Sequence, residues 1–307
     1  MSSQVIRIAT RASPLALTQA RIVAEALRRR HGLAERDLEL VRITTSGDAA
    51  RHRRLSEIGK GLFTKEIEEA LVSGDADLAV HSMKDMETRL PDGLAVAALA
   101  EREDPRDVLV SVTGARTLAA LPAGAVLGTS SLRRAALVRS LRPDIAIVPL
   151  RGNVETRLGK VAKGGIDATL LARAGLNRLG LEPANASPLD IDEVLPAVAQ
   201  GAIGIEIRAD DRRVRELVEP LDHRATRLAV TAERALLATL DGSCTTPIAA
   251  LATLDDGAIR LRALIARPDG STVHRVDICG PESDAAALGR SAGAQLLARA
   301  CPGFFDM

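Results

Sequence analysis

The nine residues DLAVHSMKD, at positions 77–85, decide how we interpret this chain. Leu78, Ala79 and Val80 form a short apolar run after a polar start, which is typical of a buried β-strand. The run stops at His81, and polar residues follow at once. Ligands of open α/β folds bind just beyond the carboxyl ends of strands, so the sequence predicts a functional site here.

The polar residues of this stretch have a chemical interpretation and a simpler one. Ser82, Lys84 and Asp85 bring a hydroxyl, an ammonium and a carboxylate to one strand end. A fixed Lys–Asp pair is suited to acid–base chemistry or to stabilising a cation. The alternative is a solvated ion pair that caps the next turn, and the stretch alone does not decide between them.

The composition is that of an ordinary globular protein. The 307 residues are 46% hydrophobic and 26% charged, which is enough for two or three domains with buried cores. A net charge of +1 and 1% aromatic residues argue against a nucleic-acid-binding surface. The start, MSSQVIRIATR, lacks the apolar segment of a secretory signal, and no apolar run reaches the roughly 18 residues of a membrane helix. We therefore expect a soluble cytoplasmic protein with no membrane or nucleic-acid partner.

The three cysteines have neither metal-type spacing nor a disulfide framework, which fits a reducing compartment. Cys244 lies in the polar loop at 241–247 and is a candidate nucleophile or attachment point, with an inert thiol as the alternative. No ligand cluster suggests a metal, and no GxGxxG or GxxxxGK[ST] motif suggests a nucleotide.

Cationic and hydroxyl side chains recur where other predicted strands end. Beside Arg11, Ser13 and Pro14 are placed to begin a helix, whose free N–H groups can bind an anion. A plain helix cap is the alternative there. The later strand ends carry Thr129, Ser130, Ser131, Arg133, Arg134, Arg151, Arg157, Arg173 and Arg178. Each such turn alone can be ordinary surface, but their repetition predicts a site for a polyanionic ligand.

Two similar α/β halves are followed by a different third part. The charged stretch 101–107 predicts a crossing into the second half, and the small-residue stretch 197–202 a return to the first. The last part predicts an antiparallel sheet covered by a helix, with strands at 248–253, 258–266 and 272–279 and the helix at 283–299.

Together these motifs resemble the porphobilinogen deaminase (hydroxymethylbilane synthase) family. The resemblance runs from Arg7 to about Leu297, and the ordered set is specific although no single motif is. The motifs are RIATRASPLAL, GKGLFTKEIE, AVHSMKD, EREDPRD, LPAG, GTSSLRR, LRGNVETRL, AGLNRLGL, TAERALL and IRLRALIARPDG.

This resemblance implies an α/β protein of three domains. Two are α/β domains of the type II periplasmic-binding-protein kind, flanking an active-site cleft, and the third is a smaller α+β domain with a three-stranded antiparallel sheet. We place the first domain at 1–100, completed by 201–219, the second at 101–200 and the third at 220–307. The resemblance also suggests a monomer.

The resemblance further implies a transferase of tetrapyrrole (haem) biosynthesis. The family joins four porphobilinogen molecules head to tail, loses ammonia each time, and releases hydroxymethylbilane by hydrolysis. The chain grows on a dipyrromethane cofactor, which Cys244 would hold through a thioether bond. Asp85 matches the catalytic aspartate, which would accept pyrrole N–H bonds, stabilise the cation that forms when ammonia leaves, and assist proton transfers.

Other positions match family residues that hold the acidic arms of the pyrrole rings. Arg suits this task because its guanidinium binds carboxylates in a bidentate way. The residues that match cofactor contacts are Ser82, Lys84, Thr129, Ser130, Ser131, Arg133, Arg134, Arg151 and Gln200. Those that match substrate contacts are Arg11, Ser13, Lys60, Arg157 and Arg178.

Four places depart from the family pattern. The lid sequence IGKG, at 58–61, is one glycine short, Met86-Glu87 stands for Val-Pro, and Ser243 stands for the glycine before the cysteine. Ala199 replaces a glycine, so the backbone there is strained if this position needs a positive φ. The competing interpretation is a two-lobed solute-binding protein, which would need neither Cys244 nor a third domain.

Overall fold

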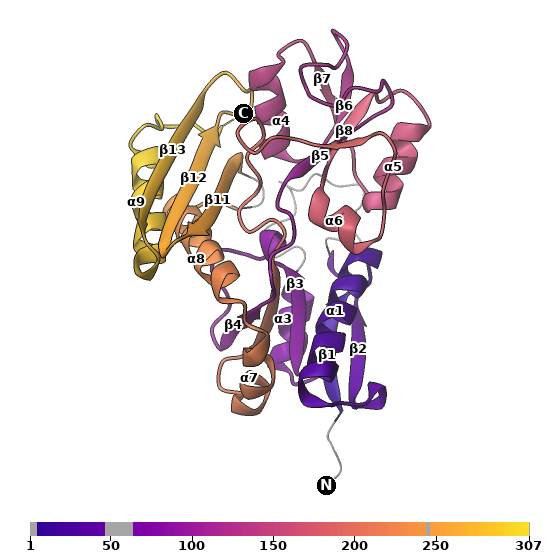
Figure 1. The fold of residues 1–307 in the computed structure, drawn as a ribbon, viewed down its shortest axis with the longest axis vertical. Helices are drawn as coiled ribbons and strands as arrows, with labels where there is room; N and C mark the ends of the chain where they lie inside the picture. Colours follow the sequence, from indigo (N-terminus) through magenta and orange to yellow (C-terminus); the bar gives the residue numbers. More distant parts are fainter. Residues whose placement is uncertain (1–4, 47–63, 244–245, 307) are drawn as a thin grey trace. The chain divides into compact units, whose positions relative to one another are not determined.

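The structure, a computed structural model, describes residues 5–46, 64–243 and 246–306. The chain divides into two compact units, 1–103 with 202–227 and 104–201 with 228–307. The described residues form two five-stranded sheets and one three-stranded sheet, as predicted (Figure 1). Because the second and third sheets share one unit, the predicted domain boundaries stay predictions.

The first unit is built on a mixed sheet with the strand order β2-β1-β3-β10-β4. Strand β1 runs parallel to β2 and β3, whereas β10 runs antiparallel to β3 and β4. The strands are β1 (Ile6–Arg11), β2 (Leu38–Ile43), β3 (Leu78–Ser82), β4 (Leu94–Leu99) and β10 (Ile203–Arg208). The helices are α1 (Pro14–His31), α3 (Lys65–Val72) and α7 (Arg212–Val218), with short 3₁₀ turns η1 (Glu35–Asp37), η3 (Met83–Asp85) and η4 (Glu219–Leu221).

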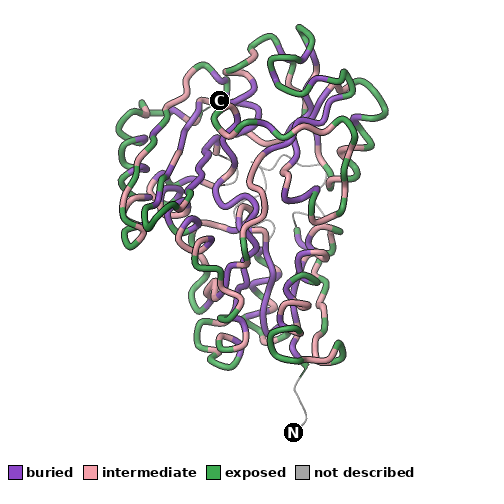
Figure 2. Tube along the Cα trace, viewed as in Figure 1, coloured by how far each residue is buried: buried purple, intermediate pink, exposed green. Residues whose placement is uncertain are grey.

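Alternating apolar residues give this sheet two covered faces. On one face, Leu78 and Val80 pack with Val23 and Leu27 of α1. On the other, Ala79 belongs to a separate cluster with residues of α3. The central strands are accordingly buried, while the helices expose their outer sides (Figure 2).

The second unit repeats this topology with the strand order β7-β6-β8-β5-β9. Strand β6 is parallel to β7 and β8, and β5 is antiparallel to β8 and β9. The elements are β5 (Asp107–Ser111), β6 (Val126–Gly128), α4 (Leu132–Leu141), β7 (Ala146–Val148), α5 (Val154–Ala162), β8 (Ala168–Ala172), α6 (Arg173–Arg178) and β9 (Ala186–Pro188). The antiparallel strand takes the same place in both sheets, so the two halves share one architecture.

The three-stranded antiparallel sheet completes the second unit. Its elements are α8 (Arg224–Thr239), β11 (Ile248–Asp255), β12 (Ala258–Ala266), β13 (Val273–Pro281), η5 (Glu282–Asp284) and α9 (Ala285–Leu297). Helix α9 covers one face of the sheet (Figure 1). Ala249, Leu251 and Leu264 belong to the same apolar cluster as Leu127 and Leu170 of the neighbouring sheet, which explains why the two sheets form one unit.

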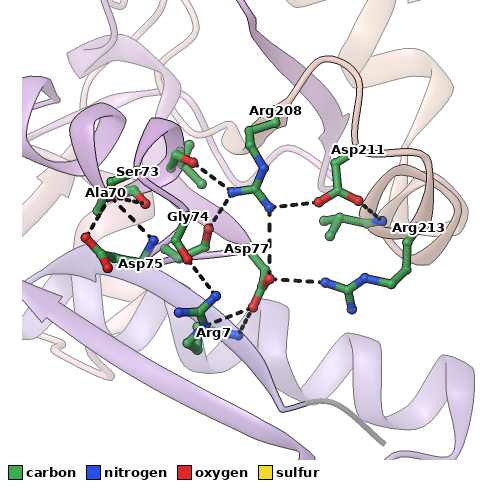
Figure 3. Close-up of polar contacts among 12 residues, drawn as sticks. Arg7, Ala70, Ser73, Gly74, Asp75, Asp77, Arg208, Asp211 and Arg213 are labelled. Carbon is green, nitrogen blue, oxygen red and sulfur yellow. Dashed lines mark hydrogen bonds and ion pairs between the residues drawn. The ribbon is translucent and has the colours of Figure 1, made fainter.

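A buried carboxylate fixes the amino end of β3. Asp77 accepts the backbone N–H of Arg7 at 2.8 Å and pairs with Arg213 at 3.1 Å, while Arg208 lies 4.0 Å away (Figure 3). Arg208 also donates to the backbone carbonyls of Leu71 and Ala76. This network ties β1, β3, β10 and α7 together at the end of β3 opposite to the predicted site.

Ala199 has a φ of 58°, in the left-handed region, as its replacement of a glycine suggested. Its N–H donates to Glu233 Oε2 at 2.6 Å, and the other oxygen of this buried carboxylate accepts the N–H of Ala252 at 2.8 Å. Glu233 therefore holds the strained residue to β11.

We expect Ala199→Gly to change the free energy of unfolding by less than about 1 kcal/mol. Relief of left-handed strain, about 1–2 kcal/mol, is offset by the lost buried methyl and by the greater freedom of glycine in the unfolded chain. Ala199→Val should instead destabilise by roughly 2–4 kcal/mol, because a branched side chain is poorly tolerated at this φ and in a closed site. Urea unfolding tests both variants, with Ala294→Val, at an exposed position of α9, as control. Equal effects of Gly and Val at 199 would contradict this account.

Candidate active site

A small pocket lies at the carboxyl end of β3 in the first unit, where the sequence predicted a site. It is lined by Arg11 at the end of β1, Ser13 at the start of α1, and Ser82 and Asp85 around the end of β3. Four of the predicted site residues therefore meet in one place. The pocket offers a guanidinium, two hydroxyls and a carboxylate to a ligand.

The helix that borders this pocket begins as predicted. Ser13 is the N-cap of α1, its hydroxyl accepts the N–H of Ala16 at 3.3 Å, and Pro14 is the first helical residue. The positive end of the helix dipole thus adds to the charge of Arg11. This corner of the pocket favours a carboxylate.

Asp85 lies in a short turn that is anchored by a buried methionine. It ends the 3₁₀ turn η3, which begins at the buried Met83. The Met83 N–H donates to the Ala202 carbonyl at 3.0 Å, and Met83 packs where a Cβ on Gly204 would lie. Lys84 and Asp85 are both half-buried. A rigid turn with a partly desolvated carboxylate suits electrostatic stabilisation of a cation.

Gln19 belongs to this pocket although the sequence did not single it out. Its Nε2 donates to the Ser82 hydroxyl at 2.8 Å, and the side chain is buried. One signal was available, since an amide on the apolar face of α1 needs a polar partner when buried.

The predicted strand is present and extends beyond the apolar run that ends at Val80. The strand continues to Ser82, and His81 is a buried strand residue whose Nε2 lies 3.0 Å from Glu206 Oε2 on β10. Glu206 is fully buried, and Glu68 of α3 lies near it. Burial is the main cause that raises the pKa of Glu68, and the charge of Glu206 acts in the same direction. His81 also lines the pocket.

In the second unit, predicted hydroxyl residues gather where β6 ends. Ser131 is the N-cap of α4 and accepts the N–H of Arg134 at 3.4 Å. The Thr129 hydroxyl accepts the Ser131 N–H, and the Ser130 hydroxyl donates to the Leu150 carbonyl. Ser131 therefore caps α4, and this helix start is suited to an anion.

The guanidinium groups of Arg133 and Arg134 are buried and engaged within the protein. Both pair with Asp107 at 2.8 Å, and each also donates to a backbone carbonyl. Gln200 donates to the same carboxylate at 2.9 Å. Burial opposes ionisation of Asp107, but the two arginines outweigh it and hold the pKa of this carboxyl well below its usual range. Cofactor binding by Arg133, Arg134 and Gln200 stays a prediction, and the structure gives them a structural task as well.

The remaining predicted arginines of this unit lie on or just before the helices that follow its strands. Arg157 Nε donates to the Gly152 carbonyl at 2.8 Å, and Arg178, at the end of α6, donates to the Gly201 carbonyl at 2.6 Å. Arg151 is half-buried just before α5. Their predicted roles toward substrate or cofactor remain predictions.

The chain matches two protein-family models over most of its length. Residues 6–216 match the dipyrromethane cofactor-binding domain of porphobilinogen deaminase, and residues 227–298 match the C-terminal domain of the same enzyme. A porphobilinogen deaminase of Paracoccus denitrificans is 51% identical over 302 residues, which cover 98% of this chain and 96% of that protein. The chain belongs to the porphobilinogen deaminase family. It is a transferase, and its family binds a dipyrromethane cofactor.

Two solved structures that are similar to this chain have low sequence identity to it. The periplasmic VFT2 domain of Bordetella pertussis BvgS is 15% identical with a TM-score of 0.42, over 71% of this chain and 86% of the domain. A YaeC-family lipoprotein of Enterococcus faecalis is 13% identical with a TM-score of 0.43, over 72% and 92%. Such low scores carry no weight for function.

The donor set of the pocket fits a dipyrromethane, which has four carboxylate arms and two pyrrole N–H groups. Arg11 and the α1 start suit the arms, and Asp85 suits the N–H groups. Two predicted site residues, Lys60 and Cys244, lie outside the described residues. Among the described residues, no group of His, Cys, Asp and Glu could hold a metal ion, and no helix has the length and apolarity to cross a membrane.

Proposed function

We propose that this chain joins four porphobilinogen molecules head to tail and releases hydroxymethylbilane. The observation that carries the proposal is the pocket at the end of β3, where Asp85 lies beside Arg11 and the start of α1. A carboxylate next to carboxylate-binding groups is what a substrate with acidic arms and a cationic transition state requires.

In this proposal the residues divide by charge. Asp85 accepts the pyrrole N–H and stabilises the ring cation that forms when ammonia leaves. Lys84 and Arg11 bind the acetate and propionate arms, and the α1 start adds backbone donors. When bound, the cofactor supplies the ring carbon to which the first substrate is joined. Cys244 is its proposed attachment point.

The setting that we propose is cytoplasmic and monomeric, without nucleic-acid or membrane partners. The low net charge and scarce aromatic residues support the absence of a nucleic-acid surface. Three cysteines without a disulfide pattern support a reducing compartment.

Substrate turnover tests the proposed function. Purified protein incubated with porphobilinogen should release four ammonia molecules for each linear tetrapyrrole. The competing interpretation, a solute-binding protein, predicts binding of a carboxylated ligand without ammonia release. Absence of ammonia release, even after a preformed tetrapyrrole is added as primer, would refute the proposal.

A further inference from the structure

Three ionisable side chains on the α3 face of the first sheet have no place in the function described so far. His81 lies on β3, Glu206 on β10 and Glu68 on α3. The register pairs His81 with Gly204 and Glu206 with Ala79, so the two side chains are diagonal neighbours on one face of the sheet. Of the three, His81 lines the pocket at the end of β3.

Burial of the His81–Glu206 pair reduces the stability of the fold. The side chain of Glu206 is 0% exposed, and its Oε1 has no hydrogen-bond partner among the described residues. The other carboxylate oxygen of Glu206, Oε2, accepts a hydrogen bond from the imidazole Nε2 at 3.0 Å. Burying an incompletely bonded carboxylate costs stability that apolar residues of similar size would not cost. Such an arrangement is a candidate for function when it borders a site.

His81 also lines the pocket. Because Nε2 is bound to Glu206, Nδ1 is the ring nitrogen that this contact leaves for a ligand. An ionised carboxylate at Nε2 fixes the tautomer in which Nδ1 carries a lone pair and can accept a proton. Of the described residues that line the pocket, His81 and Asp85 are the two whose side chains suit a proton acceptor.

The proposed reaction needs such an acceptor in addition to Asp85. In each condensation a ring carbon bonds to the methylene carbon that has lost ammonia. The C–H bond at that ring carbon then breaks, its electrons restore the aromatic ring, and a proton must leave. If Asp85 took this proton, it would have to give it up again before it could stabilise the cation of the next condensation. A second group is therefore the better acceptor.

We propose that His81, held by Glu206, is this proton acceptor, with Nδ1 taking up the proton released at each condensation. The proton then leaves with the ammonia as ammonium, so no further reactant is needed. The inference rests on the proposed function. The charged or titratable groups around the imidazole are Glu206 from β10, Glu68 from α3, Asp85 from η3, Glu87 from the segment after it, and Arg11 from β1.

The first test replaces the imidazole by a group that keeps the hydrogen bond and cannot titrate. We expect His81→Gln to lower kcat by roughly 10²-fold or more, with KM changed by less than a few fold. The acid limb that wild type shows in its pH profile of kcat should be absent from the variant. Intact mass should show the cofactor retained. A retained acid limb at wild-type pH would overturn the proposal while leaving the proposed function standing.

The second test changes the charge next to the imidazole and is read without turnover. In Glu206→Gln, loss of the carboxylate removes the charge that stabilises the imidazolium, so His81 should lose its proton at lower pH. NMR titration of labelled histidine measures this, and the His81→Gln spectrum assigns the signal among five histidines. Glu68→Gln is the matched control, because the raised pKa of Glu68 favours its neutral form. A titration unchanged in Glu206→Gln, or shifted equally in Glu68→Gln, would overturn the proposal.

Discussion

Replacement of Asp85 by Asn should lower kcat by about 10²–10³-fold and leave the cofactor bound. The amide keeps the size of the side chain and one hydrogen-bond acceptor, but it lacks the negative charge that stabilises a ring cation. Asp85 ends a turn anchored by the buried Met83, so the variant should fold with the pocket intact. Steady-state release of ammonia from porphobilinogen, combined with intact mass, measures both quantities.

A neighbouring carboxylate provides the control for this variant. Asp92 lies on the exposed turn before β4, and Asp92→Asn makes the same chemical change away from the pocket. It should retain wild-type kcat. Near-normal turnover of Asp85→Asn would mean that the pocket carboxylate is not the group that stabilises the cation.

Replacement of Asp107 by Asn should destabilise the second unit by about 3–5 kcal/mol. The carboxylate is fully buried and is the partner of Arg133, Arg134 and Gln200. Without its charge, two guanidinium groups remain buried with no counterion. Urea unfolding measures the loss, and Asp277→Asn, which removes an exposed ion pair with Arg260, should have little effect. Equal stability of the two variants would contradict a structural role for Asp107.

The same carboxylate predicts the direction of a pH effect. Its pKa is lower in the folded protein than the ordinary value of 3.8, so the folded state favours the ionised form. The resulting stabilisation is complete above that ordinary value and is lost as the pH falls toward the folded value. Wild type should therefore lose stability more steeply than Asp107→Asn between about pH 5 and pH 2. Parallel curves for the two proteins would contradict this assignment.

Local patterns were sufficient to predict most of the fold. The apolar run at 78–80 predicted β3, and the cap at Ser13 predicted the start of α1. The crossing at 101–107 and the return at 197–202 are confirmed by β5 and β10, which enter different sheets. These features are determined by residues that are close together in the sequence, so the sequence pattern was enough to predict them.

Ion pairs between residues that are far apart in the sequence could not be predicted in this way. A charged residue inside the apolar strand IGIEIR marks Glu206 as unusual, but the sequence does not show that His81 is its partner. Likewise, Arg133 and Arg134 follow a capping motif that fits a ligand, and only the sheet topology brings Asp107 between them. The structure describes neither Lys60 nor Cys244, so their roles rest on the family.

Intact mass of freshly purified protein tests the central claim most directly. The account predicts that wild type carries the added mass of two pyrrole units, and that Cys244→Ser shows the bare chain of about 32.3 kDa. Peptide mapping should place the addition on the segment that contains Cys244. A bare wild-type chain that stays bare after incubation with porphobilinogen, or an adduct that persists in Cys244→Ser, would contradict the account.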